Sequence, residues 1–399
     1  MSRTLIFLGF CTVGCLSFVS YNLVRMPALA PFAESLGAGP TSVGIVVAAS
    51  TLTGVMLKLP VGALSDLVSR RKLMLLSMAA FAGPPFLYPI LSSVEVLIGL
   101  RVVHGLATAI FTPLALATVA SMYPIQRGAA LGWYTSAAQG GALLGPLLGG
   151  WLVDHGGFAT TFTVAGWIGL LALGCYLLVL RGLTENESSF SSSRRMSEVM
   201  GEVVQGVKGI LRHTAMLAAS LAEAAKMVAN GTLMAFLPLY LVSIGLTLTE
   251  GGILFAIQGV FSFLAKPLMG RLSDRMGRRP LIPVGLLLCG GSLAVIPHMM
   301  DFSSLMWLAA SFGLGEAIVT ASSAALIADL SHSHNIGAGM GLRGTIMDMG
   351  HAVGPLLAGV LVALLGYQGA FGLISGLQIA AAGFFMVVTL RRVYEQVAH

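Results

Sequence analysis

Charged and amide side chains interrupt one of the long apolar runs of this chain at helical spacing. Glu223, Lys226 and Asn230 stand at positions i, i+3 and i+7 and would share one face of a helix. A carboxylate and an ammonium one turn apart neutralise each other and can respond when a proton or a charged solute arrives. The spacing fits such a responsive pair and a permanent structural pair equally well.

A second acid has no cation within one helical turn. Glu316 follows Gly313 and Gly315 inside another apolar run. An ionised group at the centre of a bilayer costs roughly 3 kcal/mol, so it must find a partner across a cavity or take up a proton. We therefore predict that Glu316 carries the proton in a coupled process, with a fixed hydrogen bond between helices as the alternative.

Other ionisable residues occupy apolar runs near both ends of the chain. Asp348 and His351 are one turn apart, and Arg343 lies nearer the cytoplasmic end, which suits a proton relay or a structural cluster. Arg101 is predicted to be functional, because a lone arginine seldom serves packing alone. Arg25 lies far along the first run, where it would either act in the pathway or extend its side chain to the interface.

The balance of these charges indicates the class of solute. Six cations lie within the apolar runs, against three deeply placed acids, Glu223, Glu316 and Asp348. A positive interior attracts an anionic or zwitterionic solute.

The elements that hold these residues must be membrane helices. The chain has 399 residues, of which 56% are hydrophobic and 10% are charged, whereas a soluble domain carries about 25% charged residues. A span needs about 20 apolar residues, and twelve such runs are present: 4–29, 42–64, 73–91, 94–122, 129–153, 158–180, 214–242, 249–272, 281–298, 304–330, 336–365 and 370–390.

Basic residues are distributed on one side of these runs. Of the 22 Lys and Arg, sixteen fall in the loops and ends expected on one face, so the positive-inside rule places both termini in the cytoplasm. The net charge of +6 thus reflects topology and does not indicate nucleic-acid binding. The four cysteines lie in apolar runs without metal-ligand spacing, and no cofactor or metal is expected.

A polar stretch divides the chain near its middle. We predict an N-terminal six-helix bundle over 1–181, a cytoplasmic linker over 182–213 and a C-terminal six-helix bundle over 214–399. Apolar residues recur at helical spacing in the linker, which favours an amphipathic helix on the inner membrane face, with an unstructured linker as the alternative.

The two halves repeat each other. Gly62 and Asp66, followed by Arg70 and Arg71, recur 208 positions later as Gly270, Asp274, Arg278 and Arg279, and Gly145-Pro146 recurs as Gly354-Pro355. A parallel repeat of this kind predicts a binding site between the halves near the midplane.

The repeated residues also carry a family resemblance. The loop 270–279, which includes Gly277, resembles the signature loop of the major facilitator superfamily. Arg101 with Gly105 resembles its proton-coupling motif, and the Gly-rich stretch 140–150 resembles the motif of its twelve-helix drug:proton antiporters. The resemblance implies an all-α membrane fold of twelve transmembrane helices in two pseudo-symmetric bundles.

The resemblance further implies a gate at the cytoplasmic loops. Asp66 would meet the start of span 11 and Asp274 the start of span 5, where a carboxylate faces the positive end of a helix. The same motif, formed by Gly62, Asp66, Arg70, Arg71, Gly270, Asp274, Gly277, Arg278 and Arg279, could instead only anchor the topology by its positive charge.

Glycine and proline mark spans 5 and 11 as hinges. Pro146 and Pro355 each remove one helical hydrogen bond, and the small residues allow a partner helix to approach closely. The predicted hinge residues are Gly141, Gly145, Pro146, Gly149, Gly354 and Pro355, with ordinary small-residue packing as the alternative.

These features predict a secondary transporter rather than an enzyme. The chain has no Gly-x-x-x-x-Gly-Lys-Ser/Thr, His-Glu-x-x-His or Gly-x-Ser-x-Gly motif. We expect proton-coupled antiport that exports a small organic solute from a bacterial cytoplasmic membrane, with protons and membrane lipids as partners and a monomer as the working form. A proton symporter or facilitator that imports an organic anion metabolite is the alternative, and a transport-inactive membrane sensor is a third reading.

Overall fold

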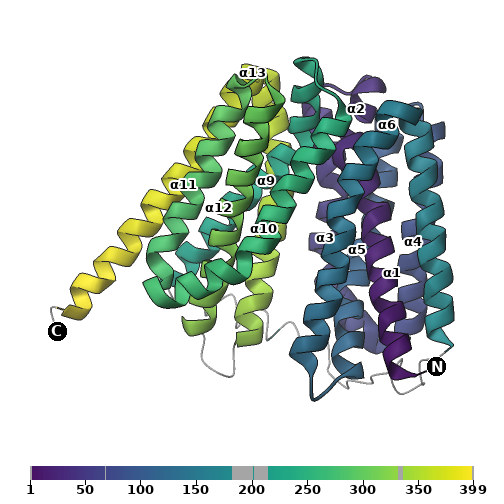
Figure 1. Ribbon diagram of the computed structural model, residues 1–399, viewed down its shortest axis with the longest axis horizontal. Coiled ribbons are helices and arrows are strands. Elements are labelled where there is room, and N and C mark those ends of the chain that lie inside the picture. Colours follow the sequence, from purple (N-terminus) through teal and green to yellow (C-terminus); the bar gives the residue numbers. More distant parts are fainter. Residues whose placement is uncertain (1, 68, 182–200, 202–213, 331–335, 398–399) are drawn as a thin grey trace. The chain divides into compact units, whose positions relative to one another are not determined.

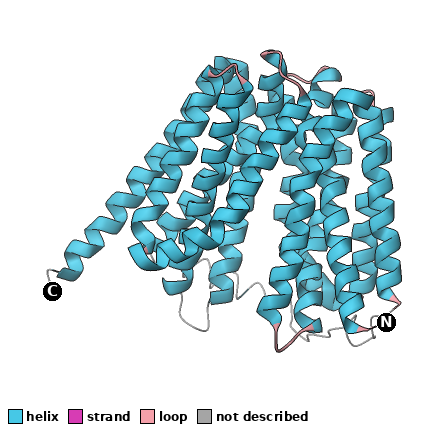
Figure 2. Ribbon diagram, in the orientation of Figure 1, coloured by secondary structure: helices cyan, strands magenta, loops and turns pink. Residues whose placement is uncertain are grey.

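The computed structural model describes residues 2–67, 69–181, 201, 214–330 and 336–397, and for 58–67, 336–342 and 390–397 it describes the backbone alone. This part of the chain is helical, with no strand (Figure 2). Its elements are α1 (Arg3–Leu23), η1 (Val24–Ala28), α2 (Leu29–Ser35), α3 (Pro40–Leu67), α4 (Arg70–Leu87), η2 (Tyr88–Ile90), α5 (Val94–Met122), α6 (Arg127–Leu180), α9 (Thr214–Ser243), α10 (Leu248–Met276), α11 (Arg278–Val295), η3 (Ile296–His298), α12 (Phe302–Leu330) and α13 (Ile336–Val397) (Figure 1).

The helices are long enough to cross a membrane. Ten helical stretches of the described residues have the length and hydropathy of a span. Two long elements are interrupted, α6 at Gly157 with φ 74° and α13 at Gly366 with φ 68°, a backbone region that glycine enters without steric cost. The all-helical membrane fold is confirmed. The count of twelve spans stays a prediction, which these two breaks support.

The first predicted span differs from a single helix. The backbone leaves the helical conformation at Met26, with φ −139° and ψ 131°, inside the π-helical element η1. Pro27 explains the break, because proline has no N–H to donate and disfavours a helical conformation in the residue before it. Arg25 therefore lies at a break in the helix and not on a regular helical face.

The chain divides into two compact units. The first comprises Met1–Met196 with Leu241–Ile253, and the second comprises Ser197–Tyr240 with Leu254–His399. The predicted domain bounds stay a prediction, and the short segment Leu241–Ile253 groups with the first unit in the structure. The predicted amphipathic helix of 182–213 lies outside the described residues, apart from Gly201.

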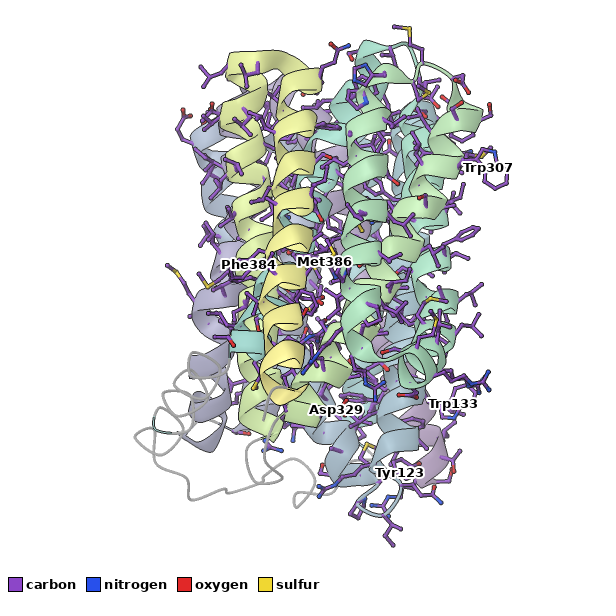
Figure 3. The ribbon with its side chains drawn as sticks, turned by 90° about the vertical axis from the view of Figure 1, so that its left-hand side faces the viewer. Tyr123, Trp133, Trp307, Asp329, Phe384 and Met386 are labelled. Atoms are coloured by element: carbon purple, nitrogen blue, oxygen red, sulfur yellow. The ribbon has the colours of Figure 1, made fainter. Side chains whose placement is uncertain are left out.

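Each unit has its own apolar core. In the first unit Phe10, Met78 and Phe111 are buried among α1, α4 and α5. In the second unit Leu286 and Val319 are buried with their neighbours on α11 and α12. Large apolar side chains also cover the outside of the second unit, where Trp307, Phe384 and Met386 are 76%, 48% and 41% exposed (Figure 3). An apolar outer surface of this kind suits contact with lipid.

The predicted hinge glycines bring helices together within each unit. A Cβ at Gly145 of α6 would lie 2.7 Å from Asn22 Cβ, and one at Gly149 would lie 2.8 Å from the Leu23 carbonyl oxygen. Gly141 likewise faces the backbone of Cys15 on α1, and Gly354 of α13 faces Val228 on α9. Non-helical dihedrals occur at Gly157 and Gly366, and none is recorded at Pro146 or Pro355. Close helix packing therefore accounts for these glycines, and their action as hinges stays a prediction.

Candidate functional site

A charge cluster lies inside the second unit and is built around the predicted pair on α9. Glu223 and Lys226 are both 0% exposed. The Lys226 Nζ donates hydrogen bonds of 2.8 Å to Glu223 Oε1 and of 2.8 Å to Thr320 Oγ1 on α12. The predicted pair therefore exists as a buried ion pair that is also tied to a second helix.

A third charge reaches this pair from α13. The Arg343 Nη2 lies 3.4 Å from Glu223 Oε1 and donates a hydrogen bond of 3.2 Å to the Thr320 carbonyl oxygen. The Ser323 hydroxyl donates to the other carboxylate oxygen of Glu223. We call Glu223, Lys226, Thr320, Ser323 and Arg343 the second-unit cluster. It contains one carboxylate and two cations.

Local packing explains why α13 approaches Glu223 so closely. A Cβ at Gly350 of α13 would lie 2.5 Å from the Ala224 carbonyl oxygen, so only a glycine admits this distance between α13 and α9. Arg343 lies about two turns before Gly350 on the same helix. The close contact between Gly350 and Ala224 therefore also brings Arg343 near α9.

The other candidates of the second unit lie outside this cluster. Glu316 on α12 is partly buried, and within the described residues it forms no hydrogen bond and no ion pair. Asn230, Asp348 and His351 are also partly buried. In the structure Glu223 thus forms ion pairs with Lys226 and Arg343. The Glu316 carboxyl group takes part in no such pair within the described residues.

A second cluster of polar groups lies inside the first unit around Arg101 of α5. Arg101 is 0% exposed. Its Nη1 donates to the Tyr88 hydroxyl at 3.4 Å, and its Nη2 donates to the Ser50 hydroxyl on α3. Its Cζ also lies 5.8 Å from the centre of the Tyr21 ring.

Arg25 shares the same aromatic ring. Its Cζ lies 5.8 Å from the Tyr21 ring centre, and its Nη2 donates to Thr51 Oγ1 at 2.9 Å. A guanidinium within about 6 Å of a ring is attracted by the ring quadrupole. Arg101 is thus held by hydroxyls and a ring, and no carboxylate partners it in the described part of the chain.

His104 completes this first-unit cluster, which comprises Tyr21, Arg25, Ser50, Thr51, Tyr88, Arg101 and His104. The His104 side chain is 0% exposed, its Nδ1 lies 3.0 Å from the Tyr88 hydroxyl, and its ring centre lies 4.9 Å from that of Tyr21. The sequence prediction did not include His104, Tyr88 or Tyr21. The signal for His104 was its position one turn after a buried arginine.

The loop motif between α10 and α11 forms ion pairs within the second unit. Arg278 pairs with Asp274, and its Nε donates at 2.9 Å to Asp329 Oδ2 at the end of α12, a residue not predicted (Figure 3). Gly277, with φ 88°, separates the two helices. The other residues of the motif are at or near the surface: Arg71 is exposed, and Arg70, Gly270 and Arg279 are partly exposed. Gly62 lies in α3. The side chain of Asp66 lies outside the described residues. The contacts of Asp66 and Asp274 with spans 11 and 5 stay predictions.

The polar groups of these clusters are not arranged for a metal ion. In the part of the chain that the structure describes, no group of three or more His, Cys, Asp or Glu side chains converges. The four cysteines are free thiols.

Two overlapping matches decide the family. The family model of the Major Facilitator Superfamily matches residues 9–247 and 219–398, so both halves of the chain are covered. The chain belongs to the Major Facilitator Superfamily. It is an integral membrane protein with several spans, and its relatives and fold are those of membrane transporters rather than enzymes.

The curated relatives of this family member are distant but cover nearly its whole length. An uncharacterized MFS-type transporter of Methanocaldococcus jannaschii is 23% identical and covers 85% of this chain and 87% of its own. The multidrug resistance protein MdtG of Klebsiella pneumoniae is 27% identical, over 95% of this chain and 92% of its own.

Solved structures of the family share the fold. A bacterial homolog of the human lysosomal transporter Spinster, in an inward-facing and occupied conformation, superposes with a TM-score of 0.79 at 16% identity, over 97% of both chains. A point mutant of the nucleoside transporter NupG superposes with a TM-score of 0.81 at 12% identity, over 96% of this chain and 99% of its own.

Proposed function

We propose that this protein is a proton-coupled antiporter that exports a small organic solute, anionic or zwitterionic, across a bacterial cytoplasmic membrane. In this proposal both termini face the cytoplasm, the protein works as a monomer, and protons and membrane lipids are its other partners. The similarity to multidrug resistance proteins named MdtG supports export.

One observation carries the proposal for the solute. The described residues bury three cations in the two clusters, Arg101, Lys226 and Arg343, and the carboxylate that these clusters contain is that of Glu223. Charges at membrane depth are expensive and typically mark ion and substrate pathways. An excess of positive charge there favours a solute that carries a negative group.

Proton coupling is assigned to Glu316. Glu223 is committed to Lys226 and Arg343, which stabilise its ionised form. Glu316 has no such partner in the described structure and is only partly buried, so it can alternate between a protonated and an ionised state during a cycle. Such an acid can exchange a proton for the solute.

The experiment uses the full-length protein in proteoliposomes. Vesicles are loaded with a solute that stabilises the purified protein, and a trapped pH dye follows protons while the solute is measured outside. Antiport predicts that solute release and proton uptake occur together and in opposite directions. Movement of both in the same direction would refute antiport in favour of symport, and indifference to the proton gradient would indicate a facilitator.

A matched pair of variants tests the assignment of the proton. Glu316→Gln should abolish proton-driven flux, whereas Glu34→Gln, at an exposed position of α2, should leave it unchanged. Unchanged proton-driven flux in Glu316→Gln would remove this residue from the mechanism.

A further inference from the structure

The first-unit cluster contains more hydrogen-bond donors than acceptors. We propose that Arg101 and His104 form a subsite for an organic oxyanion, the carboxylate or sulfonate group of the transported solute. This inference rests on the proposed transport function and specifies which residues of the first unit recognise the negative group.

One tautomer of His104 satisfies the hydrogen bonds of Tyr88. The Tyr88 hydroxyl accepts a hydrogen bond from Arg101 Nη1 at 3.4 Å, so its own hydrogen is available for His104 Nδ1 at 3.0 Å. A neutral histidine that accepts at Nδ1 carries its hydrogen on Nε2. His104 Nε2 is therefore a donor in this arrangement.

On α5, two donors of the cluster have no acceptor. His104 Nε2 and Arg101 Nε are buried and make no hydrogen bond, and they belong to residues one turn apart on α5. Buried donors without partners are rare and costly in folded proteins. Two of them on adjacent turns point to an acceptor that binds from outside the protein, and an oxyanion supplies several lone pairs.

The charges around the subsite select a negative ligand. Arg101 and Arg25 flank the Tyr21 ring, and the hydroxyls of Ser50, Thr51 and Tyr88 accept hydrogen bonds from these two guanidinium groups. No acid is among the described partners of Arg101. A buried arginine without a carboxylate is poorly compensated, and a bound oxyanion would supply the missing charge.

The residues of the first-unit cluster differ in their burial. Arg25 and Thr51 are partly exposed, whereas Arg101 and His104 are 0% exposed. Arg25 is thus the more accessible of the two guanidinium groups that contact the Tyr21 ring.

The test is ligand binding by the purified full-length protein in detergent, where no proton gradient exists. Thermal unfolding is followed in the presence of benzenesulfonate, benzoate, benzenesulfonamide or benzyltrimethylammonium, which share an aromatic ring and differ in charge. The melting temperature should rise with the concentration of the two anions and not with the neutral or cationic compound. Equal stabilisation by benzenesulfonamide, or none by either anion, would overturn the proposal.

Variants assign the effect to the subsite. Arg101→Gln should weaken benzenesulfonate binding about tenfold or more, as expected for the loss of a charge-assisted bond. His104→Gln and Tyr88→Phe should weaken benzenesulfonate binding severalfold. If Arg101→Gln does not fold, these two variants test the proposal. Arg127→Gln, at an exposed position of α6, is the matched control and should bind normally.

Failure of the subsite and failure of the transport mechanism are separable. Retention of benzenesulfonate affinity in folded His104→Gln and Tyr88→Phe proteins would overturn the subsite, whatever the vesicle experiment shows. Anion binding that depends on Arg101, in a protein whose flux ignores proton gradients, would support the subsite and refute antiport alone.

Discussion

In the second unit Lys226 and Arg343 share the carboxylate of Glu223, whereas in the first unit Arg101 is held by the hydroxyls of Ser50 and Tyr88 and by the ring of Tyr21. Glu223 is a counter-ion within its own cluster, whereas no carboxylate partners Arg101 in the part of the chain that the structure describes. A buried charge that is paired inside the protein serves structure or switching, while a buried cation surrounded by neutral donors remains able to bind an anion.

The internal repeat shows that packing and charge follow different rules. Gly105 of α5 lies against the backbone of Ser50 on α3, and Gly313 of α12, 208 positions later, lies against the backbone of Gln258 on α10. At the same offset Arg101 corresponds to Ala309 and His104 to Phe312. The two units therefore share this helix contact but differ in the buried polar groups beside it, since Arg101 and His104 have apolar counterparts.

The largest expected effect is the loss of the carboxylate from the second-unit cluster. Glu223→Gln would leave Lys226 and Arg343 buried without a counter-ion, and breaking a buried pair in this way costs about 3–5 kcal/mol. The free energy of unfolding in detergent checks this value. The double variant Glu223→Gln with Lys226→Met should recover part of the loss, and a strictly additive result would contradict the proposed pairing.

A smaller effect on stability is expected for the arginine of the first-unit cluster. Arg101→Gln removes hydrogen bonds to neutral partners, worth about 1–3 kcal/mol in total, but it also relieves an uncompensated buried charge. The net loss, measured in the same unfolding assay without added anion, should be less than that of Glu223→Gln. An equal or larger loss would mean that Arg101 is a structural ion like those of the second unit.

A minor effect is expected for the ion pair between α11 and α12. The side chains of Arg278 and Asp329 are 23% and 54% exposed, and exposed pairs contribute about 0–1 kcal/mol. Asp329→Asn should therefore change the free energy of unfolding by no more than this, with a further decrease of the effect at high salt. A loss comparable to that of Glu223→Gln would show that solvent exposure does not explain the difference in stability expected between the Arg278–Asp329 and Glu223–Lys226 ion pairs.

The smallest effect belongs to an exposed acid at the start of α12. Asp301 accepts hydrogen bonds of 2.8 Å from Ser304 N and of 2.8 Å from Ser303 Oγ, and these bonds lower its pKa below the usual 3.8. Because the folded pKa is depressed, this stabilisation is present at neutral pH and is lost as the pH falls through the folded value. The small difference in melting temperature between wild type and Asp301→Ala should persist above the usual pKa of 3.8 and vanish only as the pH falls below the lowered folded pKa, and a difference independent of pH would refute this role.

Much of the fold and part of the site follow from short-range patterns. Apolar runs of about 20 residues predict membrane helices because a bilayer cannot satisfy an exposed backbone. The Glu223–Lys226 pair follows in the same way, because residues three apart on a helix are neighbours whatever the rest of the chain does. The α-helical class, the repeat and this pair were therefore available before any coordinates.

Contacts between distant helices could be decided only by tertiary structure. Arg343 meets Glu223 across 120 positions, Arg101 meets Ser50 across 51, and Arg278 meets Asp329 across 51. Such contacts depend on how far each helix is rotated and shifted against its neighbours, which small residues such as Gly105 and Gly350 set through close backbone approach. A linear pattern specifies which side chains share a face of one helix, but the choice of the facing helix arises only when the whole unit packs.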